Sequence, residues 1–103
     1  MEDEQRKRCF IRGYAIGEII GSLKTNTREF AEDMIEHKLA GGTLIKSLRF
    51  FFSGITECGI SSDKVENAMR VIDEIEEAWK EENVDRLTSS LKQLRNIVED
   101  IIG

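Results

Sequence analysis

The 103 residues of this chain include no proline, and this absence strongly constrains its fold. Proline breaks helices because it lacks the backbone N–H and clashes with the preceding turn. Glutamate, lysine, leucine and isoleucine, which helices tolerate well, are abundant. No long segment alternates polar and apolar residues as a half-buried strand would. The sequence therefore predicts an all-α fold, a small bundle of four to five helices.

Capping residues and glycines divide the chain into its expected helices. Asn26, with Glu29 three residues later, forms a candidate capping box. Thr43, Ser61 or Ser62, and Asn83 are further candidate N-caps. Glycine accepts the left-handed conformation that ends many helices, so Gly41-Gly42 and Gly59 are the expected stops. The expected helices cover approximately residues 4–24, 27–40, 44–58, 63–82 and 84–102.

The last two expected helices carry the clearest pattern. The apolar residues of the fifth helix follow a 4-3-4-3 spacing, at Leu87, Leu91, Leu94, Val98 and Ile101. This spacing forms a narrow seam typical of a helical hairpin or coiled coil. Only a few residues join helices four and five, so they are expected to lie antiparallel. No linker, repeat or low-complexity tract interrupts the chain, which predicts one helical domain over residues 1–103.

Charge and cysteine content indicate the class of protein. The formal net charge is −5, which disfavours general nucleic-acid binding because neutralising phosphates dominates that affinity. Cys9 and Cys58 have no metal-ligand spacing and lie on apolar helix faces, so buried free thiols are expected. No apolar run is long enough to span a membrane, and the first residues do not resemble a signal peptide. A reducing cytoplasm is the expected location, without membrane association.

Three glycines on one face of the first helix are its most unusual feature. Gly13, Gly17 and Gly21 are four residues apart, and each costs a helix about 1 kcal/mol against alanine. They remove every side chain from one strip, so another helix can approach the backbone closely. Three explanations remain open: a helix crossing within the chain, a self-association face, or a kinked or broken helix.

Aromatic residues accompany this strip. Phe10 lies close to the glycines on a helical wheel, and Tyr14 extends the apolar character further round. On the third helix, Phe50 lies apart from the apolar face, so it packs on another helix of the chain or on a second subunit. Helix packing between two copies would give a two-fold homodimer. The predicted interface comprises Phe10, Gly13, Tyr14, Gly17, Gly21 and Phe50.

No motif for catalysis is complete. The acidic residues of the fourth helix could contribute to a magnesium site, but the facing stretch 87–94 contains no carboxylate to complete the shell. The single histidine, His37, lies one turn after Asp33, and two ligands do not make a metal site. No phosphate-binding glycine loop is present. No catalytic residue, metal or cofactor is therefore predicted.

We expect a non-enzymatic protein–protein interaction module, which would act as a homodimeric adaptor, regulator or assembly subunit. Its expected partner is a second copy or another protein. One alternative is a nucleic-acid-associated regulator that uses residues 6–12 together with Lys46 and Arg49. The other is a metal-dependent all-α nucleotide phosphohydrolase, which the missing carboxylates on the fifth helix disfavour.

Overall fold

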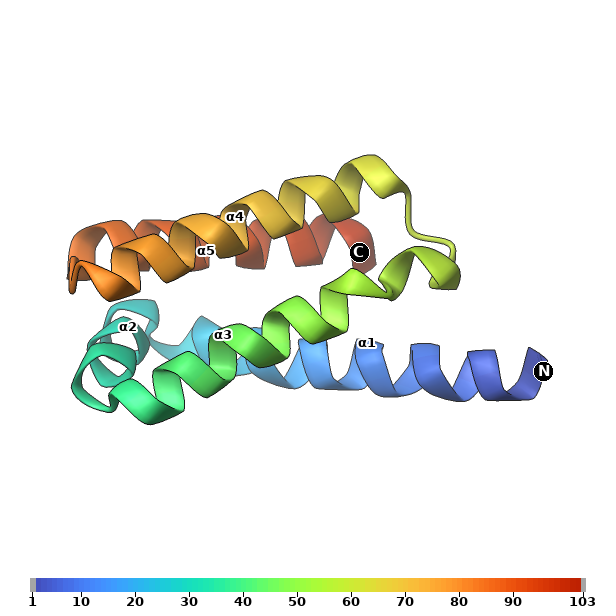
Figure 1. Cartoon of the computed structure of the whole chain (residues 1–103), viewed down its shortest axis with the longest axis horizontal. Coiled ribbons are helices and arrows are strands. Elements are labelled where there is room, and N and C mark those ends of the chain that lie inside the picture. Colours follow the sequence, from blue (N-terminus) through green and yellow to red (C-terminus); the bar gives the residue numbers. More distant parts are fainter. Residues whose placement is uncertain (1, 103) are drawn as a thin grey trace.

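The computed structural model describes residues 2–102. In this range the chain forms five α-helices and one short 3-10 turn, η1, and no strand. Figure 1 shows α4 and α5 side by side above α1 and α3, with the short α2 at one end of the bundle. The elements in chain order are α1 (Glu2–Thr25), α2 (Thr27–Glu36), α3 (Lys38–Ser53), η1 (Ile55–Cys58), α4 (Ser62–Lys80) and α5 (Val84–Ile102). The predicted all-α bundle is confirmed.

The hairpin of α4 and α5 forms half of the core. Four of the five seam residues of α5 that the sequence singled out are buried, with Leu87 and Leu94 fully inaccessible and Leu91 and Val98 nearly so, and Ile101 is half-buried. They pack against α4 and, on another side, against α2 and α1. The two helices run antiparallel over their whole length (Figure 1). The expected hairpin is therefore confirmed.

Local capping signals give the starts of α2, α4 and α5, whereas the third helix, expected to reach residue 58, ends at Ser53 and only η1 extends to Cys58. The Asn26 side chain accepts a hydrogen bond from the backbone N–H of Glu29 at 3.0 Å, and the Asn83 side chain accepts one from Arg86 at 3.1 Å. Ser61 caps α4 in the same way. Gly59 has a φ of 86°, the left-handed conformation expected of a residue that ends a helical turn. These interactions span three residues or fewer, so sequence spacing alone reveals them.

The boundary between α2 and α3 lies elsewhere than the sequence suggests. The chain bends at His37, and Gly41 and Gly42 lie inside α3. The expected helix end at these glycines, and the cap at Thr43, are therefore wrong. Gly41 is buried because its backbone lies against the carbonyl of Met34 and the indole of Trp79. Close approach, and not a left-handed turn, requires glycine at position 41.

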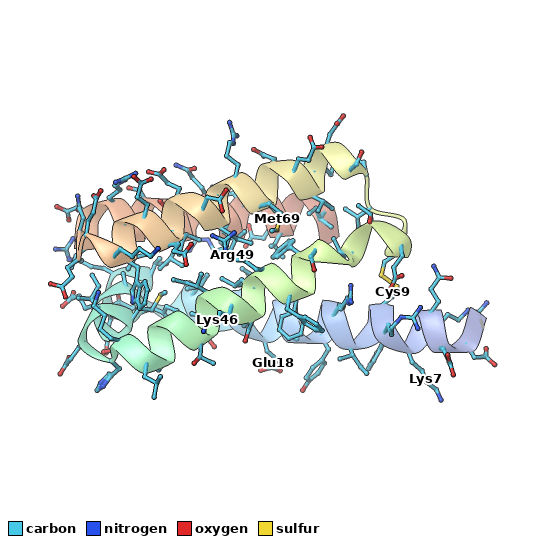
Figure 2. The ribbon with its side chains drawn as sticks, in the orientation of Figure 1. Lys7, Cys9, Glu18, Lys46, Arg49 and Met69 are labelled. Carbon is cyan, nitrogen blue, oxygen red and sulfur yellow. A yellow bond between two sulfur atoms is a disulfide. The ribbon has the colours of Figure 1, made fainter. Side chains whose placement is uncertain are left out.

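The two cysteines form a disulfide and are not free thiols. The Cys9 and Cys58 sulfur atoms are bonded, and their Cα atoms are 5.7 Å apart. The bond connects α1 to η1, the turn that follows α3. It is visible in Figure 2, where Cys9 points from α1 towards that turn. The expectation of buried thiols was wrong because two residues 49 positions apart meet only after α1 and α3 have packed.

Candidate interaction surface

The outer face of α1 carries large apolar side chains in solvent. Phe10 is 73% exposed, Tyr14 is 64% exposed and Ile11 is 60% exposed. The rings of Phe10 and Tyr14 stack one turn apart, with centroids 6.4 Å apart. The opposite face of the same helix buries Ile16, Ile20 and Leu23 in the core. A helix that is apolar on both faces has one face available for a second packing partner.

The three glycines of α1 lie on this outer side and touch nothing else. All three are exposed, and a Cβ atom built on any of them would find no atom within 4 Å outside its local helix. No other helix within residues 2–102 crosses the strip, so the expected alternative of an internal helix crossing is wrong. The helix is also one continuous element through all three positions, which excludes a broken helix (Figure 1).

Phe50 is exposed but does not join the glycine strip. Its side chain is 64% exposed on α3, and its ring centroid lies 5.6 Å from the Cζ atom of Arg12. Arg12 fills the space beside Gly54, where a Cβ atom would clash with the guanidinium. The turn of 100° per residue separates Arg12 from Gly17 by about 140° around α1. The structure thus groups Phe10, Tyr14 and the glycines, and places Phe50 on another edge.

The acidic residues of α4 are largely neutralised by two arginines that the sequence analysis did not connect to them. Arg86 on α5 donates hydrogen bonds to Glu74 at 2.6 Å, Glu81 at 2.8 Å and Glu77 at 3.3 Å. From α3, Arg49 donates to Asp73 at 2.6 Å and to Glu76 at 2.8 Å (Figure 2). These ion pairs connect three helices and occupy the carboxylates that a metal would need.

The hydrogen bond from Arg86 lowers the pKa of the Glu74 carboxyl below its ordinary value of 4.5. A carboxylate with a lowered pKa in the folded state stabilises the fold above the ordinary value, and this contribution disappears as the pH falls through the lowered value. In return, the carboxylates raise the pKa of the Arg86 guanidinium, chiefly through the hydrogen bond to Glu74. Arg86 therefore remains charged throughout that range.

This linkage predicts the pH dependence of an Arg86→Gln variant. We expect the variant to be less stable than the wild type at neutral pH, and the difference to narrow as the pH falls below about 4.5. Urea unfolding at a series of pH values measures this difference in the free energy of unfolding. Arg70→Gln is the matched control, because Arg70 bonds only Asn67 in the described chain. A difference that stays constant across the acid range would contradict this role of Glu74.

The other candidate sites contain few of the groups that their chemistry requires. No cluster of three or more His, Cys, Asp or Glu residues within the described range could hold a metal. Asp33 and His37 border a hollow of about 330 Å³ between α2 and α3, whose other lining residues are chiefly apolar. The basic residues do not form one patch, because Arg8 pairs with Glu57 and Arg49 with two acids of α4. Lys46 stays exposed on α3.

No helix in the described part of the chain is long and apolar enough to cross a bilayer. Comparison with known protein families, curated proteins and solved structures gives no match to this chain. The exposed aromatic residues and the glycine strip beside them make the outer face of α1 the candidate interaction surface.

Proposed function

We propose that the protein is a non-enzymatic interaction module whose binding surface is the outer face of α1, and that its partner is a second copy of the chain. One observation carries the proposal: Phe10 and Tyr14 lie largely in solvent beside a strip of backbone that nothing covers. Large apolar side chains that cluster in solvent often mark a protein–protein interaction site. Aromatic residues are also enriched at the centres of such sites.

The glycines explain why a helix fits this surface best. Each lowers the intrinsic stability of α1 by about 1 kcal/mol, and no packing within the chain compensates. A helix laid against the strip would approach the backbone closely and gain van der Waals contact along it. A surface of this kind on a closed two-fold dimer is covered by the same surface of the other copy. An adaptor, regulator or assembly subunit would use it in this way.

The two alternative functions receive less support from the described side chains. A nucleic-acid regulator would need free cations, but Arg8, Arg12 and Arg49 are turned to groups of the chain itself. A phosphohydrolase would need free carboxylates on α4, where Arg86 and Arg49 engage four of them, together with Glu81 just beyond the end of the helix.

A Gly17→Leu variant tests the proposal. No atom lies within 4 Å of a Cβ at this position, so the monomer accommodates leucine without rearrangement. We expect the variant to keep its helical circular dichroism and a cooperative thermal transition, while its mass in sedimentation equilibrium falls from dimer to monomer. A helix cannot approach the strip once a side chain occupies it.

Asn96→Leu provides the control, because Asn96 is exposed on a different helix, α5. This variant adds the same side chain and is expected to remain dimeric. A wild-type protein that sediments as a monomer at tens of micromolar would overturn the homodimer. An unfolded Gly17→Leu chain would contradict the exposed position of the glycine.

A cytoplasmic location remains part of the proposal, but the disulfide is typical of oxidising compartments, so the redox state of the two cysteines tests that location. Glutathione and thioredoxin keep most cytosolic thiols reduced, whereas disulfides persist in oxidising compartments. Alkylation of thiols in intact cells, followed by mass spectrometry, reports the state of Cys9 and Cys58. Modification of both cysteines supports the cytoplasm, and protection of both indicates an oxidising compartment.

A further inference from the structure

Two opposite charges share the exposed edge of α1 and have no ion-pair partner among the side chains that the structure describes. Lys7 and Glu18 are exposed, and within residues 2–102 neither side chain makes an ion pair. Figure 2 shows both side chains projecting from the same edge of α1, away from the other helices. Eleven residues correspond to about three helical turns, so the two charges stand nearly in line, about 16 Å apart along the axis.

The order of these charges distinguishes the possible pairings of two α1 helices. A parallel pairing in register would place Lys7 against Lys7 and Glu18 against Glu18, and like charges repel. An antiparallel pairing reverses the order, so that position n of one helix faces position 25 − n of the other when the two-fold axis passes between residues 12 and 13. Lys7 then faces Glu18 of the second copy, and symmetry repeats this ion pair.

The same register places the aromatic residues together. Phe10 of one copy lies within one residue of the level of Tyr14 in the second copy, because 10 and 14 add to 24. A contact between Phe10 of one copy and Tyr14 of the other therefore forms on each side of the axis. Gly17 and Gly21 then face the first turns of the second α1, and their bare backbone leaves room for its side chains.

We infer that two copies pair antiparallel along the outer face of α1, with the two-fold axis between residues 12 and 13 and with Lys7 bonded to Glu18 of the second copy at both ends. This inference rests on the proposed function, since it specifies the register of that dimer. Exposed ion pairs of this kind select orientation and register more than they add affinity.

Charge reversal tests the register. Each of Lys7→Glu and Glu18→Lys converts two attractions into two repulsions, which we expect to raise the dimer dissociation constant about tenfold at low salt. An equimolar mixture of the two variants restores opposite charges at both ends, but only in a heterodimer. We expect that mixture, and the double variant Lys7→Glu/Glu18→Lys, to return to within about threefold of the wild-type value.

Analytical ultracentrifugation with one variant fluorescently labelled measures the homodimers and the heterodimer separately. Lys92→Glu is the matched control, because Lys92 is exposed on α5 and makes no ion pair in the described chain. Circular dichroism confirms that each variant is folded. If the wild type dimerises but the mixture is not rescued, this register is wrong and the proposed function stands. If the wild type remains a monomer, both fall.

Discussion

Loss of the Cys9–Cys58 disulfide is expected to lower the free energy of unfolding by about 4 kcal/mol, because the bond closes a loop of 49 residues in the unfolded chain. A cross-link over a loop of this length strongly restricts the unfolded ensemble and so disfavours it. A domain of this size has a total stability of only about 5–10 kcal/mol. The disulfide therefore supplies a large share of it.

The bond also fixes the position of the first turns of α1, which make few other contacts with the bundle. Residues 3–8 are exposed, and the first fully buried side chain of the helix is that of Ile16. Beyond the disulfide, the first turns make a hydrogen bond from Gln5 to the backbone of Glu57 and an ion pair between Arg8 and Glu57. Without the bond, we expect the first turns of α1 to lose their position before the bundle unfolds.

The measurement compares the wild type with a Cys9→Ser/Cys58→Ser variant by urea unfolding. Hydrogen exchange of amides in the first turns distinguishes local loosening from global destabilisation. Wild-type protein treated with a dithiol reductant is the control and should match the variant. A change of less than about 1 kcal/mol would contradict stabilisation by closure of the 49-residue loop.

The sequence predicts the elements whose signals are local. Regular apolar spacing identifies α5, and caps three residues from their partners fix the starts of α2, α4 and α5. The disulfide and the Arg86 network depend on residues brought together by packing. No spacing rule predicts such contacts from one sequence. The composition of the α1 strip was evident, but its exposure depends on which face of α1 the other helices cover.

Gly41 shows how a distant residue overrides a local signal. A Gly-Gly pair after an amphipathic segment is a typical helix stop. Here the indole N–H of Trp79 donates to the carbonyl of Met34 at 2.9 Å, and Gly41 lies against both groups. Trp79 is 45 residues from Met34 in the chain. The helix break therefore moves to His37, and the glycine serves the close approach of α2, α3 and α4.

A Gly41→Ala substitution is expected to destabilise the fold by about 3 kcal/mol, although alanine is the better helix former by about 1 kcal/mol. The new Cβ would lie 2.5 Å from the Met34 carbonyl oxygen and 2.6 Å from the Trp79 Nε1 atom. Moving the backbone of Met34 would disturb α2, so we expect the indole of Trp79 to move instead. Its hydrogen bond to the Met34 carbonyl is then lost. A partly buried N–H without an acceptor adds its own cost.

Two matched glycines isolate this effect. At Gly42 the nearest atom to a Cβ is the outer edge of the Trp79 ring at 3.2 Å, so alanine is expected to cost much less there. At Gly13 no atom lies within 4 Å, and alanine is expected to stabilise the monomer through helix propensity. Urea unfolding, followed by circular dichroism, should therefore rank the variants Gly41→Ala, Gly42→Ala, Gly13→Ala in increasing stability.

A double-variant cycle attributes the cost at position 41 to the indole. Trp79→Phe removes the N–H donor and shrinks the ring, which frees space beside Gly41. If the clash with the indole dominates, Gly41→Ala costs clearly less in the Trp79→Phe background than in the wild type. An equal cost in both backgrounds would assign the effect to the Met34 carbonyl alone. The contact between α2 and α3 would then account for the glycine without Trp79.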